Sequence, residues 1–221
     1  MIRGVFFDAN GVLYDRNEST VQSVRHMLAS LGYATSQTEE VQRHLKHLSG
    51  EATCGRISHE EYWSTYLAFH GVKDDSLVKD LLKQISENTD SIVPVPGSRE
   101  VLETLRKRNK KIGVITDTMV PLEVKLMWLD AAGLPEHIFD AFVCSTVIGA
   151  RKPDAAMYED AAAQAGITCG EALFVGHAAD ELEGAKEAGM VTAAVNADPG
   201  AIGDYNLAAL QDLLELPLLR E

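Results

Sequence analysis

The feature that most constrains the fold is an apolar run, Val5-Phe6-Phe7, that ends abruptly in Asp8. Consecutive bulky residues of this kind predict a strand that is buried on both faces, as in a parallel sheet. Asn10-Gly11 follows as a turn dipeptide, because both residues tolerate positive φ. An acid at the carboxyl end of the first strand of an α/β sheet lies where such sheets bind ligands. The stretch therefore predicts a sheet protein with a polar site at residue 8.

The second half of the chain alternates between strand and helix patterns. Short apolar runs at 112–115, 141–144, 172–175 and 191–195 predict strands, with the last of them closing the sheet. The segments 98–109, 121–133, 153–166 and 180–188 between and after these runs have helical periodicity. This alternation predicts an α/β fold with a doubly wound parallel sheet. Leucines at 207, 210, 213 and 214 predict a terminal helix that packs on the core.

The segment from about Arg16 to Thr89 shows helical periodicity and no strand pattern. Four helices are expected, and the third begins at the capping box Ser58-His59-Glu60-Glu61. Because 221 residues are many for one domain and few for two, we predict a core formed by residues 1–15 and 93–221. Residues 16–92 would form a small helical domain inserted after the first strand. Its aromatic residues at helical spacing are interpreted as core: Tyr62, Trp63 and Tyr66.

The composition limits the kinds of partner that the protein is expected to bind. The formal net charge is -13, and the dense basic run Arg106–Lys111 falls at the end of a predicted helix, where cations complement the helix dipole. We therefore expect neither nucleic acid nor an anionic membrane as a partner. No apolar stretch has the length of a transmembrane helix and the N-terminus lacks a signal-peptide pattern, so a cytoplasmic location is expected. Three scattered cysteines, without metal-type spacing, fit reduced thiols: Cys54, Cys144 and Cys169.

Polar residues follow later strands in the way that Asp8 follows the first. Thr116-Asp117 ends the strand at 112–115, and Lys152-Pro153 precedes a predicted helix with Tyr158 further along it. The run Phe174-Val175-Gly176-His177 closes another strand and leads to the acids Asp180 and Glu181. The carboxyl ends of parallel strands meet at one edge of the sheet, so these residues are expected to lie near one another.

In this order the motifs resemble those of the haloacid dehalogenase-like (HAD) hydrolase superfamily. Its first motif, Asp-x-Asp-Gly-[Thr/Val]-Leu, is matched at positions 8, 11, 12 and 13, and its third by Lys152-Pro153 and Tyr158. The skeleton of its fourth motif is matched from Val175 to Met190. The resemblance covers essentially the whole chain and implies a Rossmann-like core with a helical cap over the active site.

The resemblance also implies a role for each residue. Asp8 would be the nucleophile that forms a covalent ester with the substrate. Thr116, with Asp117 beside it, would bind the substrate's phosphoryl oxygens, and Lys152 would offset their charge. Mg²⁺ would be held by Asp8, by the backbone carbonyl of Asn10 and by an acid of the fourth motif.

Two departures from the family pattern lie at this centre. Asn10 replaces the Asp that protonates the leaving oxygen and later activates water, steps worth about 10²–10⁴-fold each, and an amide does neither. His177 replaces the Mg²⁺-binding acid, so that Asp180 or Glu181 would have to reach the metal and Mg²⁺ affinity should fall. A protonated His177 could instead act as a fixed cation beside Asp8.

Three interpretations of function stay open. The first is a phosphatase that acts through Asp8 on a small phosphorylated metabolite, with weakened or unusual Mg²⁺ dependence. The second is a catalytically impaired relative with a binding or regulatory role. The third is the metal-independent 2-haloacid dehalogenase branch, which shares Asp-Ala-x-Gly and needs no general acid, because a halide leaves as an anion. That branch has Tyr at Asn10 and Ser-Asn at Thr116-Asp117, and its halide-binding arginine could be Arg25, Arg43 or Arg56.

Overall fold

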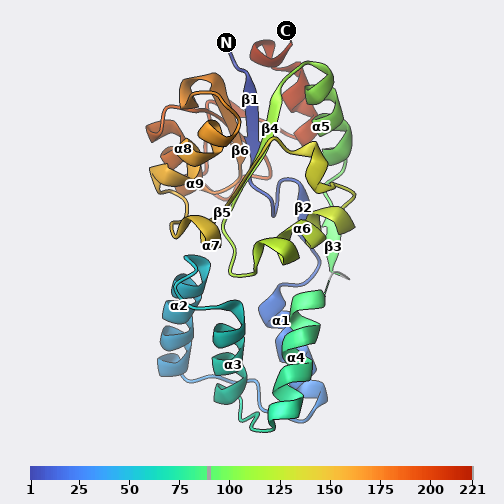
Figure 1. Cartoon of the computed structure of the whole chain (residues 1–221), viewed down its shortest axis with the longest axis vertical. Coiled ribbons are helices and arrows are strands. Elements are labelled where there is room, and N and C mark those ends of the chain that lie inside the picture. Colours follow the sequence, from blue (N-terminus) through green and yellow to red (C-terminus); the bar gives the residue numbers. More distant parts are fainter. Residues whose placement is uncertain (89–90, 221) are drawn as a thin grey trace.

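The computed structural model describes residues 1–88 and 91–220. Its central sheet has six strands in the order β5-β4-β1-β6-β7-β8, and every neighbouring pair is parallel (Figure 1). The predicted doubly wound α/β class is therefore confirmed. The strands are β1 (Gly4–Phe7), β4 (Lys111–Thr116), β5 (Ala141–Cys144), β6 (Ala172–Gly176), β7 (Val191–Ala194) and β8 (Tyr205–Asn206).

Helices cover both faces of this sheet (Figure 1). Alternate residues of β1 point to opposite faces, so Phe7 belongs to one hydrophobic cluster and Phe6 to the other. The Phe7 cluster includes residues of α5 (Ser98–Lys107) and α6 (Leu122–Ala131). The Phe6 cluster includes residues of α8 (Ala155–Gln164) and α9 (Ala179–Glu187), and the short α7 (Ser145–Ile148) precedes α8.

Strand β1 is fully enclosed, with all four residues buried, as are the five residues of β6. The ring of Phe6 occupies the space beside Gly113 on β4, where an added Cβ would lie 2.4 Å from Phe6 Cδ1. Because β1 lies between β4 and β6, the chain winds away from it in both directions. The carboxyl end of β1 is thus the topological switch point of the sheet, and Asp8 follows it directly.

Four helices lie between β2 (Tyr14–Arg16) and β3 (Ile92–Pro94): α1 (Thr20–Ser30), α2 (Glu39–Thr53), α3 (His59–Phe69) and α4 (Asp75–Glu87). We call them the four-helix unit; they lie beyond the carboxyl ends of the central strands (Figure 1). The unit has a hydrophobic cluster of its own that contains Tyr62, Trp63 and Tyr66. The assignment of residues 16–92 to a separate domain stays a prediction, and Thr89, where the predicted helical stretch ends, is outside the described residues.

The structure differs from the sequence prediction at two places. Arg16 belongs to β2, which pairs antiparallel with β3 and joins the entry and exit of the four-helix unit; strands this short leave no periodic signal. The strand at 191–195 is not the last, because β8 pairs with β7 after it. In place of a terminal α-helix there are two 3-10 helices, Leu210–Glu215 and Pro217–Leu219, separated where Pro217 lacks the donor that a continuing helix needs. Two further 3-10 turns span Glu136–Ile138 and Cys169–Glu171.

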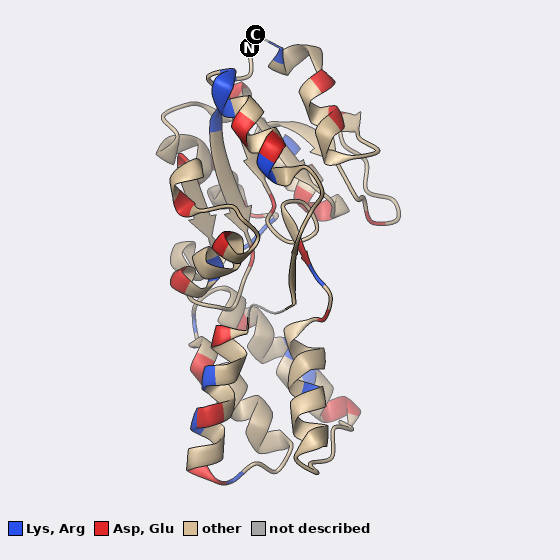
Figure 2. Ribbon diagram, turned by 90° about the vertical axis from the view of Figure 1, so that its right-hand side faces the viewer, with Lys and Arg blue, Asp and Glu red and all other residues tan. Residues whose placement is uncertain are grey.

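The basic run Arg106–Lys111 lies at the C-terminal end of α5, close to both chain termini (Figure 2). Arg106, Arg108 and Lys110 donate hydrogen bonds to backbone carbonyl oxygens, and Lys111 pairs with Asp140. These cations therefore have structural partners within the fold. Among the described helices, none combines the length and the apolar character needed to cross a membrane.

Candidate active site

Asp8 is buried at the carboxyl end of β1 between two cationic side chains. Lys152 Nζ lies 2.7 Å from Asp8 Oδ1, and His177 Nε2 lies 3.3 Å from Asp8 Oδ2. Lys152 Nζ also lies 2.9 Å from Glu181 Oε1. One carboxylate is thus held by an ammonium on one side and an imidazole on the other.

The sheet brings these groups together from four strand ends. Lys152 is in the loop before α8, preceding Pro153 in a cis peptide bond, and its backbone N–H donates to Asp117 Oδ1 at 3.1 Å. Tyr158 on α8 donates its hydroxyl to the backbone carbonyl of Glu181 at 2.7 Å. The loops after β1, β4 and β6 and the loop before α8 are therefore joined by direct contacts, as their shared position at the sheet edge predicts.

His177 is packed against the turn that follows Asp8. Gly11 in that turn has φ +79, and a Cβ there would lie 3.3 Å from His177 Cδ2, so glycine both permits the turn and leaves room for the ring. Asn196 Nδ2 donates to the Gly11 carbonyl at 2.8 Å, and Asp198 Oδ2 lies 3.5 Å from His177 Nδ1. The ring is therefore held between two carboxylates.

These contacts shift the pKa values of the paired groups so that the charged form of each group is favoured. Burial of Asp8 opposes its ionisation, but the charge of Lys152 and the hydrogen bonds from His177 and Lys152 outweigh burial and hold its pKa well below the ordinary value. Burial likewise opposes the charge of Lys152, yet the carboxylates of Asp8, Glu181 and Asp117 raise its pKa. Asp8 and Lys152 are therefore a charged pair at neutral pH.

His177 and Glu181 have pKa values close to the neutral range. The hydrogen bond to Asp8, which outweighs burial, raises the pKa of His177 to about 9, so the ring is protonated at pH 7. Burial raises the pKa of Glu181 to about 7, against the opposing charge of Lys152. The site therefore combines a fixed cation, His177, with a carboxyl group that can gain or lose a proton near neutrality.

A cavity of about 320 Å³ opens beside this network, between the sheet edge and the four-helix unit. From the core it is lined by Asn10 and Asp117, which place it next to the loops that hold Asp8. Its remaining walls include Tyr14, Arg16, His59, Trp63, Met119, Lys125 and Trp128. We call it the interface cavity.

The sequence profile of the haloacid dehalogenase-like hydrolases matches residues 5–195. The chain belongs to this family. It is similar to a phosphatase of Mycobacterium tuberculosis, 36% identical over 95 residues that make up 43% of each chain. It is also similar to the glyceraldehyde 3-phosphate phosphatase of Methanopyrus kandleri, 27% identical over 87% of this chain and 83% of that protein. The fold is similar to that of a 2-haloacid dehalogenase from Pseudomonas syringae pv. Tomato, with a TM-score of 0.75, 24% identity and 97% coverage of both chains.

The resemblance to HAD phosphatases implies Mg²⁺, but the residues at this site do not fit it. Ligand atoms of Asp8, His177 and Glu181 lie within 4.8 Å of one another. However, a protonated imidazole has no lone pair to offer, and one oxygen each of Asp8 and Glu181 is already paired with Lys152. Mg²⁺ requires near-octahedral oxygen coordination. In this HAD protein, His177 therefore places positive charge beside Asp8 where the family pattern has a metal-binding acid, and Lys152 is the lysine of the third motif.

The remaining predicted site residues are placed as follows. Thr116 is buried at the end of β4, and Asn10 is exposed and lines the interface cavity. Asp180 is exposed in the first turn of α9 and its Oδ1 accepts from the backbone N–H of Glu181 at 3.0 Å, so its carboxylate lies outside the ion-pair network. Of the two acids predicted to approach a metal, the structure brings only Glu181 to Asp8.

The three arginines considered for halide binding lie elsewhere. Arg25 donates to the Tyr66 hydroxyl at 3.3 Å, while Arg43 and Arg56 line a separate cleft beside α2. None of these three lines the interface cavity. The cations that do line it, Arg16 and Lys125, were not identified from the sequence.

Proposed function

We propose that this chain is a hydrolase that forms an aspartyl ester at Asp8 with a small phosphorylated substrate without requiring Mg²⁺. The observation that carries the proposal is the Lys152–Asp8–His177 arrangement, in which a buried carboxylate is flanked by two positive charges. The curated relatives that are similar over most of the chain are named phosphatases, which supports a phosphoryl substrate. The same two cations would face the phosphoryl oxygens once the substrate is bound.

In the first step a carboxylate oxygen of Asp8 attacks phosphorus. A bond forms between that oxygen and phosphorus while the bond from phosphorus to the leaving oxygen breaks, and the leaving oxygen departs with the electron pair as an anion. The low pKa of Asp8 keeps the nucleophile ionised. Lys152 and His177 stabilise the negative charge that spreads over the phosphoryl oxygens.

In the second step water attacks phosphorus and the aspartyl–phosphorus bond breaks, which returns its electron pair to Asp8. The proton of the attacking water goes to Glu181. Glu181 suits this role because its pKa is about 7 and its Oε2 is buried without a hydrogen-bond partner. The residue that the family uses for this purpose is Asn10 here, and an amide does not accept the proton.

The lack of an acid at Asn10 bears on the leaving group. With no proton to receive, the departing oxygen must be stable as an anion, so the enzyme should favour acyl, enol or aryl phosphates over alkyl phosphates. The same observation favours one second candidate, halide release from a short 2-halocarboxylate, because a halide needs no proton at all.

The test is hydrolysis of a series of aryl phosphates with leaving groups of graded pKa, in Mg²⁺ and in chelator, beside a 2-chlorocarboxylate assayed for halide. We expect phosphate release that survives the chelator and falls steeply as leaving-group pKa rises. Asn10→Asp should flatten that dependence by restoring an acid, and Asn10→Asp with His177→Asp should make activity depend on Mg²⁺. Activity only in the doubly restored variant would contradict metal-free turnover, and halide release alone would select the dehalogenase.

A further inference from the structure

Two cations face the interface cavity without a carboxylate partner. Lys125 on α6 is buried, with 3% of its surface exposed, and its Nζ donates to the Tyr14 hydroxyl at 2.6 Å. Arg16 on β2 is half-buried and donates only to the hydroxyls of Ser91 and Thr20. Neither side chain forms an ion pair with any carboxylate in the described part of the chain. A buried cation without a counter-ion is costly, which is unusual unless a ligand supplies the missing charge.

The aromatic residues around these two cations hold them in place, and so fix where the negative charge of a ligand would bind. The Arg16 guanidinium lies 4.5 Å from the ring centroid of Trp128, and Lys125 Nζ lies 5.7 Å from the same centroid. Lys125 Nζ is also 5.1 Å from the centroid of Tyr14. Both cations therefore stack on one indole and are held at the wall of a single cavity.

Unpartnered donors complete the wall. The indole N–H groups of Trp63 and Trp128 are buried without a hydrogen-bond partner. His59, 8% exposed, has neither ring nitrogen in a well-directed hydrogen bond, although the Met119 backbone faces it, and burial lowers its pKa so that the ring is neutral. Orphaned buried donors are uncommon in folded proteins, and here they accompany the two unpaired cations.

The one acid that lines the cavity lies at its other end. Asp117 accepts from the backbone of Lys152 and so belongs to the Asp8 side. Asn10, two residues after Asp8, lines the same cavity as Arg16 and Lys125. A ligand that spans the cavity would therefore reach both Asp8 and the cation pair.

We propose that the interface cavity is a subsite for a second anionic group on the substrate, held by Arg16 and Lys125 while the phosphoryl group lies at Asp8. The substrate class is thus a compact phosphoryl compound that also carries a carboxylate or a second phosphate. The volume of about 320 Å³ suits a molecule of a few carbon atoms. This inference rests on the proposed function for its reaction, but binding to the subsite can be measured without turnover.

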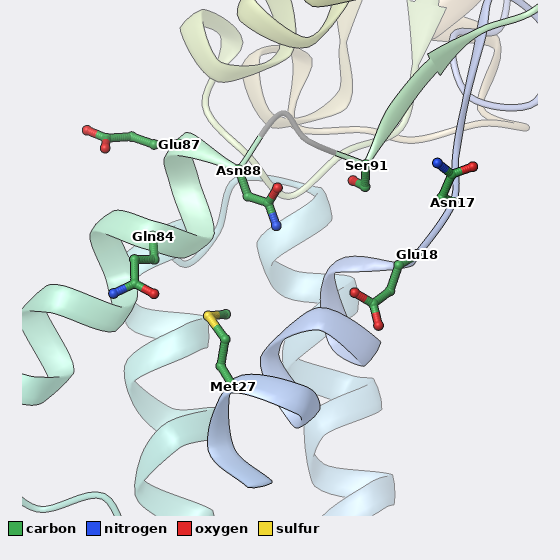
Figure 3. Close-up of a pocket in the computed structure, with 7 residues that line it drawn as sticks. All are labelled: Asn17, Glu18, Met27, Gln84, Glu87, Asn88 and Ser91. Carbon is green, nitrogen blue, oxygen red and sulfur yellow. The ribbon is translucent and has the colours of Figure 1, made fainter. Parts of the chain in front are cut away.

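A second hollow on the four-helix unit differs in charge. It lies between α1 and α4, and the seven side chains labelled in Figure 3 include two charged ones, Glu18 and Glu87. These acids would repel the anion that Arg16 and Lys125 would attract. The charge of the lining thus favours the interface cavity over this hollow for an anionic group.

The chain provides its own probe of this cavity, because its two tryptophans, Trp63 and Trp128, both line it. We would titrate intrinsic fluorescence with a short 2-hydroxycarboxylate, with its uncharged amide, and with the corresponding alcohol phosphate. We expect saturable quenching or a shift with the two anions and little response to the amide. Lys125→Met and Arg16→Gln should weaken anion binding on the order of 10–100-fold, as for loss of a charge-assisted hydrogen bond. Arg16→Lys should recover part of it, and Lys107→Met, at an exposed position on α5, should bind as the unaltered protein does.

Measurements of turnover form the second part of this test. The ratio of kcat/KM for an enol phosphate that carries a carboxylate to that for the same enol phosphate without the carboxylate should fall in Lys125→Met by the same order, and an enol phosphate with a second phosphate tests that group as the anion. Preference for either anion supports the subsite. Anion binding without any turnover would refute the proposed function and keep the subsite. Equal binding of acid and amide, or anion binding unaffected by Lys125→Met in a protein that still folds, would overturn the inference.

Discussion

Two charged regions lie next to each other in this molecule, and they differ in whether their cations have carboxylate partners. At the carboxyl end of β1, Lys152 lies against Asp8 and Glu181, and His177 lies between Asp8 and Asp198. In the interface cavity, Arg16 and Lys125 have hydroxyls and an aromatic ring as neighbours, and no ion pair. In the first region each cation has a carboxylate partner, whereas in the second the cations have none and the indole N–H groups of Trp63 and Trp128 are orphaned, as expected of a site that is completed by an anionic ligand.

The difference follows from where each region is built. The Asp8 network is assembled by parallel strands that pair in register, so that the ends of β1, β4 and β6 arrive at one edge. The interface cavity is assembled from β2, α3, α6 and the loop after β4, which come from both sides of the join between sheet and four-helix unit. On the proposed function, the reacting centre would lie on rigid strands and recognition would lie where substitutions disturb the sheet least.

The largest effect should come from Asp8→Asn, which removes the nucleophile but keeps the size of the side chain. We expect turnover of any accepted phosphoryl substrate to fall on the order of 10⁴-fold or more. Fluorescence binding of a carboxylate in the interface cavity should persist, because Arg16 and Lys125 are untouched. Measured activity equal to that of the unaltered protein would show that Asp8 is not the nucleophile and that the two regions do not divide the work in this way.

Next in size is the stability effect of Lys152→Met. This substitution leaves Asp8 and Glu181 buried together without their shared cation, and the free energy of unfolding in urea should fall by about 3–5 kcal/mol. Lys111→Met is the matched control: Lys111 pairs with Asp140 at the surface, and its loss should cost no more than about 1 kcal/mol. Equal losses of unfolding free energy in the two variants would mean that the charges of the Asp8 network are no more shielded from water than those of a surface ion pair.

Lys125→Met should change the free energy of unfolding in the opposite direction. Methionine fills a similar volume, and removing a buried ammonium that has no carboxylate partner relieves its desolvation while losing the Tyr14 hydrogen bond and the contacts with Trp128. We expect the free energy of unfolding to change by less than about 1 kcal/mol, toward greater stability. Urea denaturation of the ligand-free protein measures it. A loss as large as that of Lys152→Met would show that Lys125 is a structural cation rather than one that a ligand completes.

A further prediction concerns the pH dependence of stability. The pKa of His177 is raised to about 9 in the folded protein from an ordinary 6.5, so its contribution is full below pH 6.5 and is lost as pH rises through 9. The raised pKa of Glu181, about 7, also makes stability fall as pH rises, but that loss is confined to the range from its ordinary 4.5 to about 7, which leaves the range from about 7 to 9 to His177. The unfolding free energy of the unaltered protein should decline over this range, and that of His177→Gln should stay level. Parallel pH profiles would contradict the ion pair with Asp8.

The Asp8 network could be predicted from the sequence because each of its strands ends in a polar residue after an apolar run. Asp8 and His177 were found in this way, and Lys152 was found by its match to the third motif of the family. The sequence could not show which of Asp180 and Glu181 approaches Asp8. Adjacent residues at the start of a helix point in different directions around the helix axis, and only the packing of the helix decides which of them faces Asp8.

The interface cavity left no such signal. Lys125 and Trp128 lie within a helix whose apolar pattern is weak, and Arg16 belongs to a strand of three residues that is defined by its partner β3. Trp63 was correctly interpreted as core, yet it also lines the cavity. Contacts between sheet and four-helix unit depend on how the two pack, and local periodicity does not encode that.

The most direct test of the account is to trap the ester at Asp8. The protein would be mixed with an excess of a small acyl or aryl phosphate in chelator, quenched in acid within its first turnovers, and digested for mass spectrometry, with Asp8→Asn treated in parallel. We predict that the peptide containing Asp8 gains the mass of one phosphoryl group in the absence of Mg²⁺ and that the variant gains none. A phosphorylated peptide that forms only when Mg²⁺ is added would contradict the account, because the charge of His177, together with that of Lys152, would then not suffice without the metal.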